Sequence, residues 1–154
     1  MNREIRKLRQ SFHYAACGLR ACMKTERNFR IHMTAAVYVA CAAAMAGLDA
    51  VRCAVLCVCF ALMMGAELMN TAIERLCDRQ ATGYDNLVRE AKDIAAAAVF
   101  LCALFCVVVG VLFFVIEGAL FSVLDFLRAR YWAIGVLLVS LPAAVWFVFH
   151  YGKN

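Results

Sequence analysis

Long apolar stretches alternate with short polar ones along most of this chain. After an amphipathic beginning, apolar runs extend over residues 33–48, 51–72, 94–116 and 131–150. The last three reach the roughly 20 residues that a helix needs to cross the hydrocarbon core of a bilayer, and the first can do so with interfacial ends. The pattern predicts an all-α membrane protein with four spanning helices.

The first thirty residues follow a different pattern. Apolar side chains recur there at steps of three and four residues, and basic side chains occupy most of the remaining arc. The apolar positions are Ile5, Leu8, Phe12, Ala15, Leu19, Cys22 and Met23. This periodicity is typical of an amphipathic helix that lies in the membrane interface. A helix packed on soluble partners has a similar pattern, but the apolar chain that follows favours the interface.

Three connections join the predicted spans. A short link over residues 47–50 makes the first two spans a helical hairpin, and a polar loop with a turn near Thr82 and Gly83 is expected over residues 75–93. A partly amphipathic connector over residues 117–130 precedes the fourth span. No stretch rich in Ser, Gly or Pro marks a linker, so we expect one compact bundle.

Composition agrees with a location in the bilayer. Hydrophobic residues make up 66% of the 154 residues, well above the roughly 45–50% of soluble domains. The net charge of +5 is compatible with nucleic-acid binding, but the basic residues stand beside apolar segments instead of alternating with aromatic ones. Anionic phospholipid is therefore the expected partner, and nucleic acid is not. The basic first thirty residues lack the apolar region of a secretory signal peptide, so export is not expected.

Nine cysteines are spread along the chain, mostly inside the apolar runs. They form no CxxC pair and have no histidines at metal-ligand spacing. We interpret them as small apolar side chains that face lipid or the protein core, and we expect neither disulfides nor a metal site from them.

Basic residues also predict the orientation of the chain. The segment before the first span has 8 Lys and Arg residues, residues 75–92 have 4, and Lys153 adds one, whereas the opposite side receives only Arg52, Arg128 and Arg130. The positive-inside rule places the richer side in the cytoplasm. Both termini and the 75–93 segment are therefore expected there, on the side where ATP is available.

A polar stripe on the second span is the most informative feature. Its members are Glu67, Asn70, Glu74 and Asp78, with Thr71 beside them. At 100° per residue the other three lie within about 60° of Glu67, on one helix face. A charge at the centre of a membrane helix costs on the order of 2.5–3.5 kcal/mol, so a carboxylate there must be solvated, paired or bound to a cation. The outer two carboxylates are also compatible with a frayed helix end, but Glu67 lies about two turns deeper.

Further polar groups return to the same side of the membrane. Glu26 precedes the first span, and Lys92 and Asp93 precede the third, so three helix ends can bring carboxylates and one cation together. Mg²⁺ prefers such hard oxygen ligands, and lysine supplies a compact charge to phosphoryl oxygens. No GxxxxGK[ST] loop and no HRD or DFG element occurs, so a phosphoryl-transfer site would be built by the helices themselves.

Four segments occur in a specific order along residues 3–116. They are Ser11-Phe12 with Ala15 and Gly18; Glu26-Arg-Asn28-Phe-Arg-Ile-His32; Glu67-Leu-Met-Asn70-Thr-Ala-Ile-Glu74 with Asp78; and Ala91-Lys92-Asp93-Ile-Ala-Ala-Ala-Ala-Val99. Together they resemble the prokaryotic diacylglycerol kinase and undecaprenol kinase family. The resemblance implies a lipid kinase domain over residues 1–116, with an interfacial N-terminal helix and three spans. Residues 117–154 would add a connector and a fourth span at the periphery.

The resemblance also implies roles for individual residues. It assigns the catalytic base to Glu67, the divalent metal to Glu26 and Glu74, the nucleotide to Asn70, Lys92, Asp93, Tyr14, Tyr84 and Asp85, and supporting positions to Asn28 and Asp78. It further implies ATP and Mg²⁺, a homotrimer with active sites between subunits, and a bacterial cytoplasmic membrane. The lipid would enter laterally between the N-terminal helix and the spans.

The predicted function is ATP-dependent phosphorylation of a membrane lipid hydroxyl. The Glu-x-Asn-Phe-x-Ile-His form at residues 26–32 resembles the undecaprenol kinase branch and favours undecaprenol, with diacylglycerol as the alternative acceptor. A distant alternative is a non-enzymatic membrane subunit or an ion-carrying transporter. The chain shows no clear inverted repeat, and its charges gather on one side, which disfavours the transporter.

Overall fold

The computed structural model describes residues 3–80 and 85–152, and these residues form helices and no strands. The elements are α1 (Arg3–Thr25), α2 (Arg27–Ala46), α3 (Ala50–Gln80), α4 (Asn86–Gly110), the π-helix η1 (Val111–Ile116), α5 (Ala119–Ala129) and α6 (Tyr131–His150). The predicted all-α class is confirmed. The helices α2, α3, α4 continued by η1, and α6 are each long and apolar enough to cross a membrane, so the prediction of four such helices is also confirmed.

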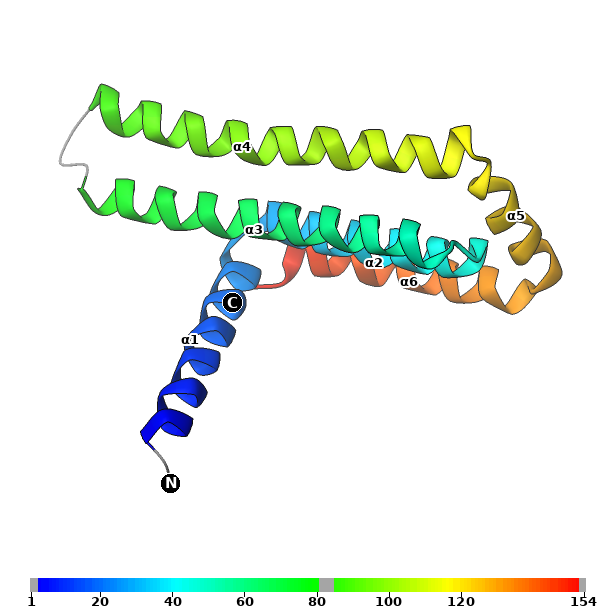
Figure 1. The fold of residues 1–154 in the computed structure, drawn as a ribbon, viewed down its shortest axis with the longest axis horizontal. Coiled ribbons are helices and arrows are strands. Elements are labelled where there is room, and N and C mark those ends of the chain that lie inside the picture. Colours follow the sequence, from blue (N-terminus) through cyan, green and yellow to red (C-terminus); the bar gives the residue numbers. More distant parts are fainter. Residues whose placement is uncertain (1–2, 81–84, 153–154) are drawn as a thin grey trace.

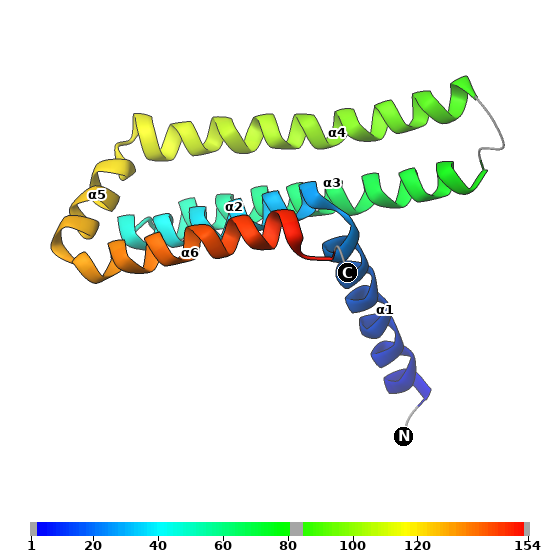
Figure 2. The ribbon, with the colours of Figure 1, turned by 180° about the vertical axis from the view of Figure 1, so that it is seen from behind.

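The four long helices run side by side, and α1 leaves them at a steep angle (Figures 1 and 2). Helix α3 packs on α4, and α2 packs on α3, α5 and α6. The end of α1, the start of α2 and the end of α6 meet at one place, and the α3–α4 hairpin extends past it (Figure 1). This hairpin and this meeting point carry most of the candidate site residues that the structure describes.

The steep orientation of α1 suits a helix in the membrane interface. Its apolar side chains Ile5, Leu8 and Phe12 are 57%, 59% and 69% exposed in the single chain. An apolar face that the protein leaves open is available to the acyl region of a membrane. Glu26 separates α1 from α2 with an extended backbone (φ −98°, ψ 113°), which makes a sharp elbow between the two helices.

The predicted hairpin between the first two spans is confirmed. Gly47 ends α2 in the left-handed region (φ 67°), where glycine has no steric penalty. Its N–H donates to the carbonyl of Ala44, and the N–H of Leu48 donates to the carbonyl of Ala43. Helix α2 itself begins at Arg27, before the apolar run that starts at residue 33.

The expected polar loop over residues 75–93 is wrong in its extent. Helix α3 continues to Gln80, and α4 begins at Asn86, where the Asp85 carboxylate accepts a hydrogen bond from the N–H of Leu87 at 2.8 Å. Polar residues there do not end the helices, because Arg, Lys and Glu are good helix formers. The turn expected near residues 82 and 83 lies outside the described residues.

The predicted connector after residue 116 contains a short helix, α5, which packs against α2. Gly118 begins it with a φ of 79°. Just before this turn, Glu117 accepts a hydrogen bond from Arg52 Nε at 2.5 Å, and Arg52 also pairs with Asp49. The backbone N–H of Arg52 lowers the pKa of the Asp49 carboxyl, and the guanidinium charge adds to this effect. We call these three residues the Arg52 cluster.

Candidate functional site

Glu67 is the buried centre of the polar stripe on α3. Its residue surface is only 3% exposed, and His32 of α2 places Nε2 at 3.2 Å from its Oε1. This pair is within ion-pair distance, yet Oε1 accepts no aligned hydrogen bond from the groups that the structure describes. Leaving a buried acceptor unsatisfied costs about 1–3 kcal/mol, and more for a charged group. Such a group in a membrane helix is a candidate for function and not for stability.

The next turn of α3 continues the polar stripe. Asn70 Nδ2 donates a hydrogen bond to Glu74 Oε1 at 2.8 Å. The other amide atom, Asn70 Oδ1, is buried and has no hydrogen-bond partner in the described part of the chain. Two buried oxygens in adjacent turns of α3, on Glu67 and Asn70, thus accept no hydrogen bond from the residues that the structure describes.

Thr71 and Cys22 join α3 to the end of α1. Both are buried, and Thr71 Oγ1 lies 3.4 Å from Cys22 Sγ. Burial raises the pKa of the Cys22 thiol, so this cysteine stays protonated at neutral pH. A protonated, buried thiol is unreactive, in agreement with the interpretation of the cysteines as apolar side chains.

Glu26 reaches the same region from the elbow. Thr25 Oγ1 donates to Glu26 Oε1 at 2.7 Å, and Arg75 of α3 donates to Thr25 Oγ1 at 2.7 Å. The guanidinium of Arg75 lies 3.9 Å from Glu26 Oε1. Glu26 and Glu74 are both electrostatic neighbours of Glu67. Three carboxylates therefore share one region around the start of α2 and the middle of α3.

This donor set suits Mg²⁺ in its chemistry. Among residues 3–80 and 85–152, no three His, Cys, Asp or Glu side chains lie close enough together to hold a metal ion by themselves. Mg²⁺ usually keeps several waters and takes one or two carboxylates plus substrate phosphates, so a complete protein cage is not required. The oxygens of Glu26 and Glu74 are hard ligands of the right type, and the unpartnered oxygens of Glu67 and Asn70 lie nearby. The assignment of Glu26 and Glu74 as ligands stays a prediction.

A second polar cluster lies on the α3–α4 hairpin. Lys92 of α4 pairs with Asp78 of α3, and Glu74 is an electrostatic neighbour of this lysine. At 1.5 Å per residue, Asp78 lies about 16 Å along α3 from Glu67. We call Thr25, Glu26, His32, Glu67 and Arg75 the elbow cluster, and Asp78 and Lys92 the hairpin cluster. Glu74 lies between the two.

The remaining candidates of α2 and α4 are at the surface. Asp93 lies 3.7 Å from Arg89 of the same helix, Asp85 caps the start of α4, and Asn28 is exposed in the first turn of α2. Tyr84 lies outside the described residues. Their predicted contacts with nucleotide stay predictions.

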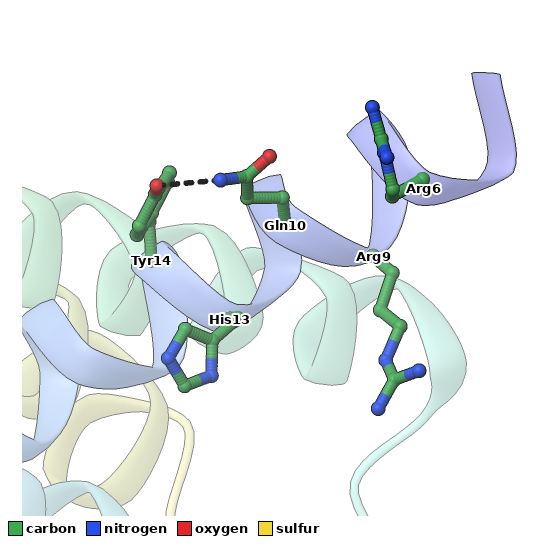
Figure 3. Close-up of a pocket in the computed structure, with 5 residues that line it drawn as sticks. All are labelled: Arg6, Arg9, Gln10, His13 and Tyr14. Carbon is green, nitrogen blue, oxygen red and sulfur yellow. Dashed lines mark hydrogen bonds between the residues drawn. The ribbon is translucent and has the colours of Figure 1, made fainter. Parts of the chain in front are cut away.

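Tyr14 lies farther out on α1. It is 62% exposed, and its hydroxyl accepts a hydrogen bond from Gln10 Nε2 at 2.8 Å. Figure 3 shows both residues with Arg6, Arg9 and His13 around a shallow depression on this helix. All five side chains come from α1.

Two grooves adjoin the elbow cluster. The first, of about 290 Å³, lies among α2, α3 and α4, and its lining is apolar except for His32. The second, of about 610 Å³, lies between α1 and α3 and is lined by Gly18, Cys22, Leu68, Thr71, Ala72, Arg75, Leu76 and Arg79. We call them the inner groove and the α1–α3 groove. The α1–α3 groove lies where lateral entry of a lipid was predicted.

Sequence reasoning assigned no role to two residues of the elbow cluster, His32 and Arg75. A histidine directly before the first apolar run was the available signal for His32. Arg75 had no comparable signal, because an arginine near the end of a membrane helix usually reaches the interface. Its link to Thr25 of α1 depends on how the helices pack.

Comparisons with known proteins bear on the whole region just described. The sequence model of the family described as "Prokaryotic diacylglycerol kinase" matches residues 13–114. This range includes every candidate site residue and ends before α5 and α6.

Individual relatives have both of the names that the sequence suggested. The diacylglycerol kinase of Synechocystis sp. is 44% identical over 101 residues, which cover 65% of this chain and 58% of that protein. The undecaprenol kinase of Bacillus subtilis is 32% identical over 109 residues, or 71% of this chain and 89% of that protein. The diacylglycerol kinase of Escherichia coli is 33% identical over 95 residues, or 62% and 78%.

Proposed function

The chain belongs to the prokaryotic diacylglycerol kinase family, and we propose that it is a membrane lipid kinase that transfers the γ-phosphoryl group of ATP to a lipid hydroxyl. The single observation that carries the proposal is the state of Glu67. Its carboxylate is buried and lies beside His32, which lines the apolar inner groove, and its Oε1 accepts no hydrogen bond from the described part of the chain. A lipid hydroxyl beside this oxygen would give it the missing donor.

The arrangement suits general-base catalysis. Glu67 accepts the proton of the lipid hydroxyl as the hydroxyl oxygen attacks the γ-phosphorus, and the bond from this phosphorus to the bridging oxygen of ADP breaks. Lys92 places positive charge against phosphate oxygens, and Asn70 orients Glu74 through its hydrogen bond. Bound Mg²⁺ supplies further positive charge to these oxygens, and Glu26 and Glu74 are the residues that would hold it.

The acceptor that we propose first is undecaprenol. Residues 26–32 have the form that resembles the undecaprenol kinase branch, and the Bacillus subtilis relative is named an undecaprenol kinase. Diacylglycerol is the second candidate, because the relative with 44% identity is named a diacylglycerol kinase. The apolar lining of the inner groove suits the tail of either alcohol.

We also propose that the active enzyme is a homotrimer with sites between subunits. Support comes from the separation of the two polar clusters. Lys92 pairs with Asp78, which lies about 16 Å along α3 from Glu67 in the same chain. The long apolar surface of α4 supports it as well, because an apolar stretch of 18 residues within Asn86–Ile116 contains no buried residue. A neighbouring copy packed on this surface would bring a second set of candidate residues close to the first.

The proposed location is the bacterial cytoplasmic membrane, with the site on the cytoplasmic face. The distribution of Lys and Arg supports this orientation. Reporter fusions after Asn154 and within the 117–130 connector should lie on opposite sides of the membrane. If both lie on the same side, α6 does not cross and the orientation is wrong.

The deciding experiment is an ATP-dependent phosphorylation assay of the purified protein in mixed micelles. Undecaprenol and diacylglycerol are offered in parallel, and the oligomer size is measured on the same sample. We expect turnover of at least one alcohol, and the ratio of the two specificity constants ranks the acceptors. A folded oligomer that phosphorylates neither would contradict the kinase proposal and favour a non-enzymatic role.

A further inference from the structure

Arg30, in the first turns of α2, is a buried charge with no carboxylate partner among residues 3–80 and 85–152. Its surface is 4% exposed, and its guanidinium donates to three backbone carbonyls. Nε donates to the carbonyl of Val148 at 3.0 Å, and Nη1 donates to those of Met23 at 2.9 Å and Lys24 at 3.1 Å. A buried arginine must be satisfied by hydrogen bonds, and here the backbone of two other helices supplies them.

These carbonyls have a common position in their helices. Met23 and Lys24 belong to the last turn of α1, and Val148 belongs to the last turn of α6. Carbonyls there have no intrahelical partner and form the negative end of the helix dipole. The planar guanidinium can serve several acceptors at fixed angles, which the ammonium of lysine cannot do. Arg30 thus joins the ends of α1 and α6 to the start of α2.

The chain just after α6 packs against the same place. Gly152 has a φ of 83°, and a Cβ atom added to it would lie 2.1 Å from the carbonyl oxygen of Lys24. This approach is open only to glycine. Nearer the middle of α6, Ser140 Oγ accepts a hydrogen bond from the hydroxyl of Tyr38 of α2 at 3.0 Å. The contact of α6 with the elbow is therefore one end of a longer contact with α2.

We propose that α6 is a positioning element for the active site. Docked through Arg30 and Gly152, it fixes the angle between α1 and α2 and so holds Glu26 in place opposite Glu74. The docking rests only on the contacts above, whereas the consequence for Glu26 as a metal ligand rests on the proposed function. On this account the fourth span is a working part of the kinase, although it lies outside the region that matches the family.

The docking is tested by limited trypsin digestion of the full-length protein in detergent, with cleavage after Lys24 and Arg27 followed by mass spectrometry. Arg30→Lys keeps the charge but loses the planar donor set, and Gly152→Ala places a methyl group against the Lys24 carbonyl. Arg20→Lys, on the exposed side of α1, and Gly135→Ala, in α6 with open space around it, are matched controls. We expect several-fold faster cleavage at the elbow in the two test variants and wild-type rates in the controls.

The positioning of Glu26 is tested by the Mg²⁺ concentration that gives half-maximal turnover. We expect it to rise several-fold in Arg30→Lys, with turnover at saturating Mg²⁺ close to that of wild type. Wild-type elbow cleavage in both test variants would overturn the docking. Faster cleavage with unchanged Mg²⁺ dependence would overturn the positioning of Glu26. If the wild-type protein phosphorylates neither alcohol, the proposed function fails, while the cleavage rates still decide whether α6 holds the elbow.

Discussion

Two charged residues of helix α3, Arg52 and Glu67, differ in how completely their side chains are paired. Near its start, the side chain of Arg52 is 38% exposed and pairs with both Asp49 and Glu117. Farther along, Glu67 is buried, and its Oε1 has no aligned hydrogen bond from residues 3–80 or 85–152. In the Arg52 cluster, a charge that links the start of α3 to the turn before α5 has two partners within the chain. The incomplete pairing of Glu67 therefore points to a partner that arrives from outside the chain.

The largest effect is expected from Glu67→Gln. Turnover should fall by about 10²- to 10⁴-fold, the usual effect of losing a positioned general base. Mg²⁺-dependent nucleotide binding should persist, and thermal stability should stay the same or rise, because the variant removes a buried charge with an unsatisfied oxygen. Turnover is measured at saturating lipid and ATP, and nucleotide binding is measured separately. Near wild-type turnover by a variant that binds nucleotide normally would refute the assignment of the base.

Glu74→Gln should affect metal dependence more than chemistry. A neutral amide is a poorer partner for a hard divalent cation, so the Mg²⁺ concentration for half-maximal nucleotide binding should rise by about tenfold or more. Glu90→Gln, on the exposed surface of α4, is the matched control and should leave this value unchanged. An unchanged Mg²⁺ dependence in Glu74→Gln would show that Glu74 is not a ligand.

His32→Leu should have an intermediate effect. The imidazole is the polar group of α2 that lies beside Glu67, and losing one such interaction costs about 0.5–1.5 kcal/mol. This corresponds to a fall in turnover of about two- to tenfold. His32→Gln keeps a polar atom near the position of Nε2 and should retain most of the activity. Equal losses in both variants would argue that the shape of the ring matters and its polarity does not.

The smallest effect on turnover is expected from Arg52→Gln, which should lower thermal stability and leave the rate near that of wild type.

The pH dependence of stability tests the pairing of Asp49 in the same cluster. Because the folded-state pKa of Asp49 lies below its ordinary value of 3.8, its stabilising contribution is present above that pH and is lost as the pH falls. The difference in melting temperature between wild type and Asp49→Asn should be constant between about pH 6 and 8 and shrink below about pH 4. A difference that grows on acidification would contradict this account.

The spans could be predicted from sequence because the length of an apolar run is itself the property that a bilayer selects. The residue at which α2 begins could not be predicted from sequence. Arg30 interrupts the apolar pattern, and only the structure shows that its charge is taken up by the carbonyls of Met23, Lys24 and Val148. The extent of the α3–α4 hairpin was missed for a related reason, since leaving the membrane and ending a helix give the same polar signal.

The polar stripe of the candidate site was predictable because its residues belong to one helix, whose geometry fixes their relative angles. The neighbours that complete the elbow cluster belong to other helices. Which residue of α2 lies opposite Glu67 depends on the packing register of two helices, so His32 could not be identified from periodicity. The same holds for Arg75 and Thr25, which join α3 to α1 by a 2.7 Å hydrogen bond.

The length of α3 has a consequence for substrate choice. With 31 residues, it extends about 46 Å, well beyond the hydrocarbon core of about 30 Å. Glu67 lies about 20 Å from the end of the helix at Gln80, so a rigid helix holds it at a fixed distance from that end. A rigid helix across a bilayer therefore sets the depth at which Glu67 lies. If Glu67 is the base, the first criterion for an acceptor is the depth at which its hydroxyl lies, and the shape of its tail comes second. The same arrangement of helices can then phosphorylate alcohols as different as undecaprenol and diacylglycerol. A lipid whose hydroxyl lies at another depth is not phosphorylated, however well its tail fits.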